Sequence, residues 1–195
     1  MQNQLQLILA STSTYRRQLL DRLTLPYSVV SPATDESPRK DETPQALSER
    51  LARAKADAVA VLHPGAWVIG SDQVAERDGV ALGKPGDHAN AVAQLRAASG
   101  RMLRFHTAVC LRRVATDATF AYRDVTDVAF RSLDEASIER YLCSERPYDC
   151  AGSFKSEGLG IALFESIRSD DPTALIGLPL IALARMLGEA GFDAP

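Results

Sequence analysis

The sequence predicts an α/β fold in which strands and helices alternate along the chain. Residues 5–10 (LQLILA) form a nearly continuous apolar run, which is typical of a strand that is buried on both faces. Residues 44–62 repeat their apolar side chains at the spacing of an amphipathic helix. Residues 67–85 contain two strand-like segments around an Asp-Gly pair, which is a strong signal for a hairpin.

A hydroxyl-rich turn, residues 11–14, separates the first strand from the first helix. Ser13 or Thr14 can cap this helix. Because the backbone N–H groups at the start of a helix are unpaired, such a turn can also bind an anion. At 100° per residue, Arg16 falls on the buried stripe of the helix, whereas Arg17 points away from it. Arg16 is therefore a stronger candidate than Arg17 for binding phosphate. The alternative is that Arg16 forms a structural salt bridge.

The second helix follows a short strand at residues 27–30 and a polar, proline-punctuated loop at residues 31–43. Thr43 is its expected cap, and Pro44 takes the first helical position. Lys55 lies at the border of the apolar stripe, where it can reach into a cleft or simply cover the edge of the core. The stripe itself is expected to comprise Leu47, Leu51, Ala54, Ala58 and Val61.

The hairpin brings two charged residues toward each other. A buried strand at residues 67–69 precedes the hairpin strands at 74–76 and 80–82. Asp72 and Gln73 therefore follow the point where the buried strand leaves the core. The return strand carries Lys84 back toward Asp72. An ordinary surface hairpin with two surface charges explains the spacing equally well, so residues from elsewhere in the chain must decide between the two interpretations.

The second half of the chain continues the alternation. His106 lies inside a predicted strand, where a half-buried histidine with satisfied hydrogen bonds is expected rather than a catalytic one. Residues 149–160 form a glycine-punctuated loop that carries charges of both signs. The expected elements are a helix at residues 87–99, strands at 101–112 and 119–130, a helix opened by a capping box at Ser132–Glu135, a strand at 161–167 and a closing helix after Pro179.

Composition narrows the class of protein. With 195 residues and no flexible linker, one domain spanning residues 1–195 is expected. The net charge of -3 argues against a nucleic-acid-binding protein, which normally needs a basic face. The three histidines stand far apart and the cysteines form no CxxC pair, so a zinc site is not expected. Each cysteine, Cys110, Cys143 and Cys150, is predicted to be buried and structural.

The chain carries no sequence signal for a membrane or for secretion. Its first residues lack a basic n-region, and no apolar run approaches the 18 or so residues of a membrane span. We therefore expect a cytoplasmic protein with no membrane partner.

The chain carries six motifs in this order: residues 10–20 (ASTSTYRRQLL), 35–36 (DE), 70–73 (GSDQ), 83–85 (GKP), 151–158 (AGSFKSEG) and 177–180 (GLPL). Together they resemble the Maf family of nucleoside triphosphate pyrophosphatases, and most of all its branch that hydrolyses 7-methyl-GTP. The resemblance implies an elongated, two-lobed α/β fold with a central twisted mixed sheet, similar to inosine-triphosphate pyrophosphatases. It also implies a divalent cation (Mg²⁺ or Mn²⁺), a homodimer, and hydrolysis of the triphosphate to a nucleoside monophosphate and diphosphate.

The resemblance also implies a role for individual residues. Asp72 takes the place of the catalytic proton acceptor, and with Glu36 it is associated with the metal. The positions that handle phosphate fall on Ser11, Arg16, Arg17, Lys55 and Lys84, and those that separate the substrate branches fall on Tyr15, Gln73 and Glu157. One position departs from the pattern, because Tyr15 stands where the 7-methyl-GTP branch usually has Trp.

The chemistry of these residue types fits such a reaction. A triphosphate carries close to four negative charges, so its cleavage needs cations around the leaving diphosphate and a positioned water at the α-phosphorus. Methylation at N7 makes guanine cationic. A carboxylate such as Glu157, with an aromatic ring such as Tyr15 beneath the base, is therefore a complementary site.

Two alternatives stay open at the level of the sequence. The sister branch hydrolyses dTTP and UTP, but there we expect Arg, Thr and Gln in place of Tyr15, Gln73 and Glu157. The second alternative is a regulator of septum formation in cell division that does not turn over a substrate.

Overall fold

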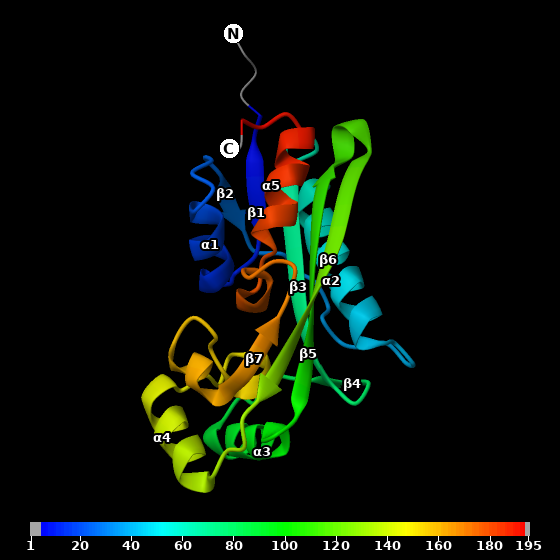
Figure 1. The fold of residues 1–195 in the computed structure, drawn as a ribbon. Helices are drawn as coiled ribbons and strands as arrows, with labels where there is room; N and C mark the ends of the chain where they lie inside the picture. Colours follow the sequence, from blue (N-terminus) through cyan, green and yellow to red (C-terminus); the bar gives the residue numbers. More distant parts are fainter. Residues whose placement is uncertain (1–4, 194–195) are drawn as a thin grey trace.

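A computed structural model describes residues 5–193 and contains one mixed sheet that runs through an elongated molecule (Figure 1). The strands are β1 (Leu7–Ala10), β2 (Ser28–Val30), β3 (Trp67–Arg77), β4 (Val80–Leu82), β5 (Met102–Arg113), β6 (Ala118–Phe130) and β7 (Phe164–Arg168). The sheet has seven strands in the order β2-β1-β3-β5-β6-β7, with β4 also paired to β3. β1, β2 and β3 are parallel, and the other pairs are antiparallel. The predicted α/β class with a mixed sheet is confirmed.

Within residues 5–193, five helices flank the sheet. They are α1 (Thr14–Asp21), α2 (Pro44–Ala60), α3 (His88–Ala98), α4 (Glu135–Glu145) and α5 (Leu180–Glu189). α1 and α5 lie beside the parallel strands near one end of the molecule, and α3 and α4 lie near the other end (Figure 1). Short 3₁₀ turns lie between them: η1 (Val114–Thr116), η2 (Ala151–Ser153), η3 (Leu159–Leu163) and η4 (Ala174–Ile176).

Side-chain caps fix where most of these helices begin. The side chains of Ser13, Thr43 and Asp87 each accept a hydrogen bond from a backbone N–H in the first turn, as predicted. The predicted capping box at Ser132 is wrong, because α4 is capped by Asp134, whose carboxylate accepts from the Ser137 N–H at 2.7 Å. Asp134 directly precedes the first helical residue, where its side chain reaches the N–H groups that need a partner.

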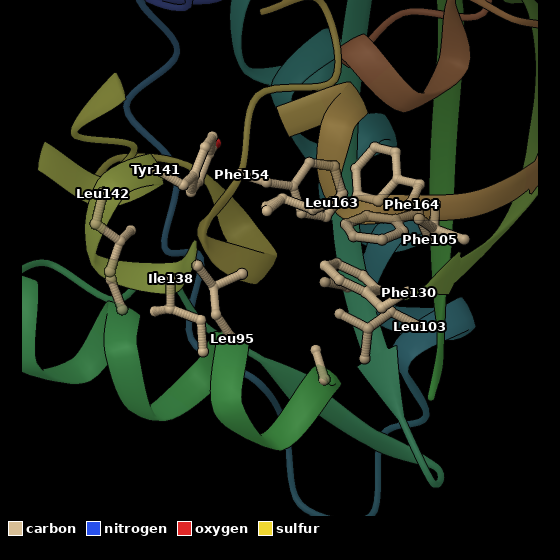
Figure 2. Packing of buried hydrophobic residues seen from close by; sticks show 14 of the residues in the cluster. Leu95, Leu103, Phe105, Phe130, Ile138, Tyr141, Leu142, Phe154, Leu163 and Phe164 are labelled. Carbon is tan, nitrogen blue, oxygen red and sulfur yellow. The ribbon is translucent and has the colours of Figure 1, made fainter. Parts of the chain in front are cut away.

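The two ends of the molecule have different cores. The core around α1 and α5 is mainly aliphatic and packs leucines from both helices against β1, β3 and β5. The core at the other end contains four phenylalanines, Phe105, Phe130, Phe154 and Phe164, which pack edge to face (Figure 2). Leu95 of α3 with Ile138 and Leu142 of α4 closes this second core (Figure 2). Aromatic pairs at these separations add stability beyond the area that they bury.

The hairpin forms as predicted. Asp78 and Gly79 have φ of 54° and 81° and connect the paired residues Arg77 and Val80. A two-residue loop with two positive φ angles matches the right-handed twist of the flanking strands, and Asp-Gly tolerates those angles. The long strands predicted at residues 101–112 and 119–130 are likewise confirmed.

Three other predictions are wrong in detail. The strand predicted at residues 161–167 begins only at Phe164, because the chain first makes a tight 3₁₀ turn in which Gly160 lies against the Lys155 carbonyl. Cys143 is exposed rather than buried, whereas Cys110 is buried and Cys150 is half-buried. The expected apolar stripe of α2 is rotated, and its consequence is given with the site below.

None of the helices in the described part of the chain is long and apolar enough to cross a membrane. The start of the chain, on which the expectation of no secretion signal depends, lies outside the described residues.

Candidate active site

A cavity of about 840 Å³ opens where the sheet is split along one edge of β3. β1 pairs with β3 as far as Gly70, and β4 pairs with it only from Ala75 onward. Within residues 5–193, residues 71–74 therefore have no strand partner on that edge, although β5 pairs with all of them on the other edge. The split lets side chains from both faces of the sheet reach one cavity.

Asp72 lies inside β3 and not beyond its end, so the predicted strand boundary at residue 69 is wrong. The strand continues because β5 supplies a ladder along its whole length. Side chains alternate along a strand, so Asp72 shares the α2 face with Gly70. A Cβ on Gly70 would lie 2.2 Å from the Ala52 carbonyl oxygen, which shows how closely α2 approaches the strand there. Asp72 is only 7% exposed.

Lys55 joins two carboxylates. Its Nζ donates to Asp72 Oδ1 at 2.6 Å and lies 2.7 Å from Glu36 Oε1. The lysine is 5% exposed and belongs to the buried face of α2, although a place at the border of that face was expected. Ala54 and Ala58 are only half-buried and Val61 is exposed, because the close contact of α2 with Gly70 turns its small residues Ala52 and Ala56 inward.

The loop that carries Glu36 is tied to α2 by an arginine. Arg50 donates to both carboxylate oxygens of Glu42, at 2.6 and 2.8 Å, and to the Ser37 carbonyl at 3.0 Å. The hydrogen bonds from Arg50 lower the pKa of Glu42 to about 2. At Glu36 itself, partial burial acts to raise the pKa, but the hydrogen bond and charge of Lys55, together with Lys84, lower it below the ordinary value.

Arg16 reaches the cavity from the first turn of α1. Its Nε donates to the Gly177 carbonyl at 2.9 Å, and in the described part of the chain its two terminal nitrogens have no protein hydrogen-bond partner. Burial lowers the pKa of Arg16, and the negative charges of Asp72 and Glu36 oppose that effect. Arg16 thus presents two N–H-bearing nitrogens close to two carboxylates, which suits an anion or an anion with a cation.

Gln73 points to the face opposite Asp72. Its Nε2 lies 3.0 Å from Thr107 Oγ1 and 3.0 and 2.9 Å from the carbonyl oxygens of Ala174 and Leu175. Since carbonyl oxygens can only accept, the orientation of the amide is fixed. The Gln73 side chain therefore holds η4 against the sheet.

The other end of the cavity is formed by the start of α1 and the loop that follows α4. The hydroxyl of Tyr15 lies 3.9 Å from the Cys150 thiol. Burial and the nearby Cys150, Asp149 and Glu157 raise the pKa of Tyr15 well above its ordinary value. Burial, with the charge of Asp149, also raises the pKa of the Cys150 thiol to about 12. Glu157 is exposed and lines this end of the cavity.

Comparison with known proteins shows the family to which this chain belongs. The sequence model of the family described as Maf-like protein matches residues 6–190. The chain belongs to the Maf-like proteins. A relative from Xanthomonas oryzae pv. oryzae (strain MAFF 311018), named 7-methyl-GTP pyrophosphatase, is 62% identical over 189 residues, which cover 97% of this chain and 98% of that protein.

Other relatives agree with this assignment. A protein of Paraburkholderia xenovorans (strain LB400) with the same name is 59% identical over 189 residues, covering 95% of this chain and 92% of that protein. The solved structure of the Staphylococcus aureus Ham1 protein aligns with a TM-score of 0.51 at 13% identity, covering 94% of this chain and 99% of that one. The last likeness concerns the fold alone.

In this Maf-like chain, nine of the ten site residues predicted from the sequence line the one cavity. They are Ser11, Tyr15, Arg16, Glu36, Lys55, Asp72, Gln73, Lys84 and Glu157. The tenth, Arg17, is exposed and does not line it; its carbonyl accepts from the Tyr27 hydroxyl. His106 is buried and pairs with Glu76 at 2.6 Å, which confirms that its hydrogen bonding is satisfied.

Sequence reasoning missed the residues that hold the cavity together from behind. Ser71 and Thr107 are fully buried and contact the loop that contains η4. Ser71 belongs to the 70–73 motif but was given no role, and Thr107 belongs to no motif, so only their hydrogen-bond partners reveal what they do. Lys155 also lines the cavity and belongs to the 151–158 motif, but it was given no role. Cys150 lines the cavity too, although it was expected only to be a structural residue.

The carboxylates of this Maf-like chain limit how a metal can bind. In residues 5–193, no group of three or more His, Cys, Asp or Glu side chains is arranged to hold a metal ion. Asp72 and Glu36 nevertheless converge on the single Lys55 Nζ. Mg²⁺ is commonly held by one or two carboxylates together with substrate phosphates, so two converging carboxylates fit a metal that arrives with a triphosphate.

Proposed function

We propose that this chain hydrolyses the α–β phosphoanhydride of 7-methyl-GTP to 7-methyl-GMP and diphosphate, with residues 1–195 as one catalytic domain. One observation carries the proposal. A single cavity combines cationic side chains and a buried carboxylate at one end with a tyrosine and a carboxylate at the other. This polarity matches a nucleotide whose phosphates are anionic and whose methylated base is cationic. The relatives named 7-methyl-GTP pyrophosphatase support it across almost the whole chain.

The phosphate end fits an attack by water on the α-phosphorus. Asp72 Oδ1 accepts from Lys55, whereas Oδ2 has no hydrogen-bond partner among the described residues. We assign to Oδ2 the proton of the attacking water. Arg16, with two nitrogens available, and Lys84, exposed at the cavity rim, would bind the oxygens of the leaving diphosphate.

The divalent cation would be held by Asp72 and Glu36. When bound, a divalent cation withdraws charge from the phosphate oxygens and so stabilises the negative charge that develops on the leaving diphosphate. Lys55 now neutralises both carboxylates. Entry of the phosphates would offer its ammonium a new anionic partner, and this would release oxygen atoms of the two carboxylates.

The base end would select for methylation. The carboxylate of Glu157 is a hydrogen-bond acceptor for the N1–H and amino group of guanine, and its charge complements the cation produced at N7. Tyr15 offers an aromatic face for the same base. A tyrosine hydroxyl is protonated at neutral pH, and the raised pKa of Tyr15 extends that range, so the ring carries no charge of its own.

The test is a panel of nucleotides assayed with Mg²⁺ and with Mn²⁺ for release of diphosphate. We expect the highest kcat/KM for 7-methyl-GTP, a lower value for GTP, and little turnover of dTTP and UTP. Preference for dTTP and UTP would assign the chain to the sister branch of the family. Absence of turnover on every nucleotide would overturn the enzymatic function and favour a regulatory role. The homodimer and the cytoplasmic location remain predictions.

A further inference from the structure

The segment from Thr173 to Gly177, which contains η4, is fastened to the sheet by a set of buried hydrogen bonds. Thr107 Oγ1 of β5 donates to the Ala174 carbonyl at 3.0 Å. Gln73 Nε2 of β3 contacts that same carbonyl, the next one along the segment, and Thr107 itself. Thr107 is fully buried, so breaking these bonds would leave polar groups without water to replace them.

The same segment ends on the carbonyl that orients Arg16. The Gly177 oxygen accepts from Arg16 Nε at 2.9 Å and lies 3.1 Å from the hydroxyl of Ser71. Ser71 is fully buried, and its one hydroxyl hydrogen is shared between this oxygen and the Ala108 carbonyl at 2.8 Å. Gly177 has φ of 129°, a backbone angle that residues other than glycine rarely adopt. The segment thus fixes the direction of the Gly177 carbonyl, and this carbonyl orients the Arg16 side chain.

Gln73 has no free donor for a nucleotide in this arrangement. Both hydrogens of its amide nitrogen are taken up by three acceptors on the side of the sheet that faces η4, whereas Asp72 lies on the α2 side. The donor hydrogens of Gln73 therefore act on Thr107 and on the Thr173–Gly177 segment.

We propose that Gln73, Thr107 and Ser71 form a buried clamp that positions the Arg16 guanidinium for the phosphates, so that Gln73 acts through Arg16 and not by contact with the base. Thr107 and Ser71 are then positioning residues. The inference rests on the proposed function for its choice of nucleotide, but the polyphosphate-binding role of Arg16 can be measured without a base.

The experiment measures binding of inorganic triphosphate to the full chain in the presence of Mg²⁺ by calorimetry. Thr107→Val keeps the shape of the side chain and removes the hydroxyl, and Gln73→Met keeps the length and removes the donors. Each should weaken triphosphate binding roughly three- to tenfold, the effect of one lost hydrogen bond. Thr107→Ser keeps the hydroxyl and should recover most of the affinity. The matched control is Ser48→Ala, which removes a fully buried hydroxyl that donates to a helix carbonyl in α2.

A double-mutant cycle decides whether the clamp works through Arg16. In an Arg16→Ala background, Thr107→Val should change triphosphate affinity by less than about twofold, because the group that it positions is gone. Additive losses would overturn the proposal. If Thr107→Val does not fold, Gln73→Met in the same background carries the identical test.

Nucleotide selectivity gives a second readout. Gln73→Met should lower kcat/KM for 7-methyl-GTP and for GTP by the same factor, leaving their ratio unchanged. A selective loss on 7-methyl-GTP would mean that Gln73 contacts the base, and the clamp would be wrong while the proposed function stands. Conversely, weakened triphosphate binding in a chain that hydrolyses no nucleotide would support the clamp and reject the proposed function.

Discussion

The two ends of the cavity are built differently. At the phosphate end, Asp72 and Lys55 are 7% and 5% exposed and stand on β3 and α2, which pack tightly on each other. At the base end, Glu157 is exposed on a loop. A buried charge must be paired and held, because desolvation is costly. An exposed carboxylate has no such requirement, so its position can change among related proteins without cost to the fold.

This contrast predicts that the two ends of the cavity control different properties. The phosphate end should control the rate of turnover, and the base end should control the choice of substrate. The groups proposed for the reaction are fixed by the same contacts that stabilise the sheet, so their alteration should affect turnover or folding strongly. The group proposed to recognise the base is joined to the structure only by its loop, so its alteration should affect the choice of substrate and little else. The following variants test that separation.

Asp72→Asn should have the largest effect. The amide cannot accept the proton of the attacking water, so we expect kcat to fall about a thousandfold, within the usual range for general-base catalysis. Nucleotide binding, measured by calorimetry, should persist because Arg16 and Lys84 are unchanged. Asp117→Asn, at an exposed turn with φ of 52° that Asn also tolerates, is the control and should retain full activity. A near-normal kcat in Asp72→Asn would assign the base to another residue.

Gly70→Ala should be the most destabilising of these variants. The added Cβ would meet the Ala52 carbonyl oxygen at 2.2 Å and the Ala56 nitrogen at 2.5 Å, both of which are helix backbone. Since α2 must shift and carry Lys55 with it, we expect a loss of about 3 kcal/mol in the free energy of unfolding, measured by urea denaturation, together with lower activity.

Gly65→Ala is the matched control for that variant. A Cβ on Gly65 would meet no atom within 4 Å, so its stability should be unchanged or slightly raised. Equal stability of the two variants would show that the contact between α2 and β3 is not what holds the phosphate end rigid.

The phosphate end illustrates how far the sequence could be interpreted. Motif residues such as Arg16 and Asp72 were identified because each follows an apolar strand at a short spacing that can be recognised in the sequence. The boundary of β3 was wrong because β5 extends the ladder past the polar residues, and such pairing is a property of distant residues. The stripe of α2 was misjudged because an alanine-rich helix has a weak apolar face, and the contact with Gly70 decides which alanines turn inward.

Glu157→Gln tests the base end without disturbing the core. The side chain is exposed, so we expect no change in stability. Loss of the charged hydrogen bond should lower kcat/KM for 7-methyl-GTP about tenfold or more, consistent with roughly 1.5–3 kcal/mol, and should lower that for GTP less. Glu165→Gln, exposed on β7 and outside the cavity, is the control. Equal activity of variant and parent on 7-methyl-GTP would remove Glu157 from base recognition.

Substitution of Tyr15 should give the smallest effect. Two variants distinguish the contribution of its ring from that of its hydroxyl. Among residues 5–193 the only hydrogen-bond partner of the hydroxyl is the Cys150 thiol, at 3.9 Å, so Tyr15→Phe should change KM for 7-methyl-GTP by less than about twofold. Tyr15→Leu removes the aromatic face and should raise KM about fivefold, on the order of 1 kcal/mol of stacking. Steady-state kinetics on both variants makes the comparison. If Phe is as damaging as Leu, the tyrosine acts through its hydroxyl, and the base end would then depend on a hydrogen bond to the ligand instead of an aromatic surface.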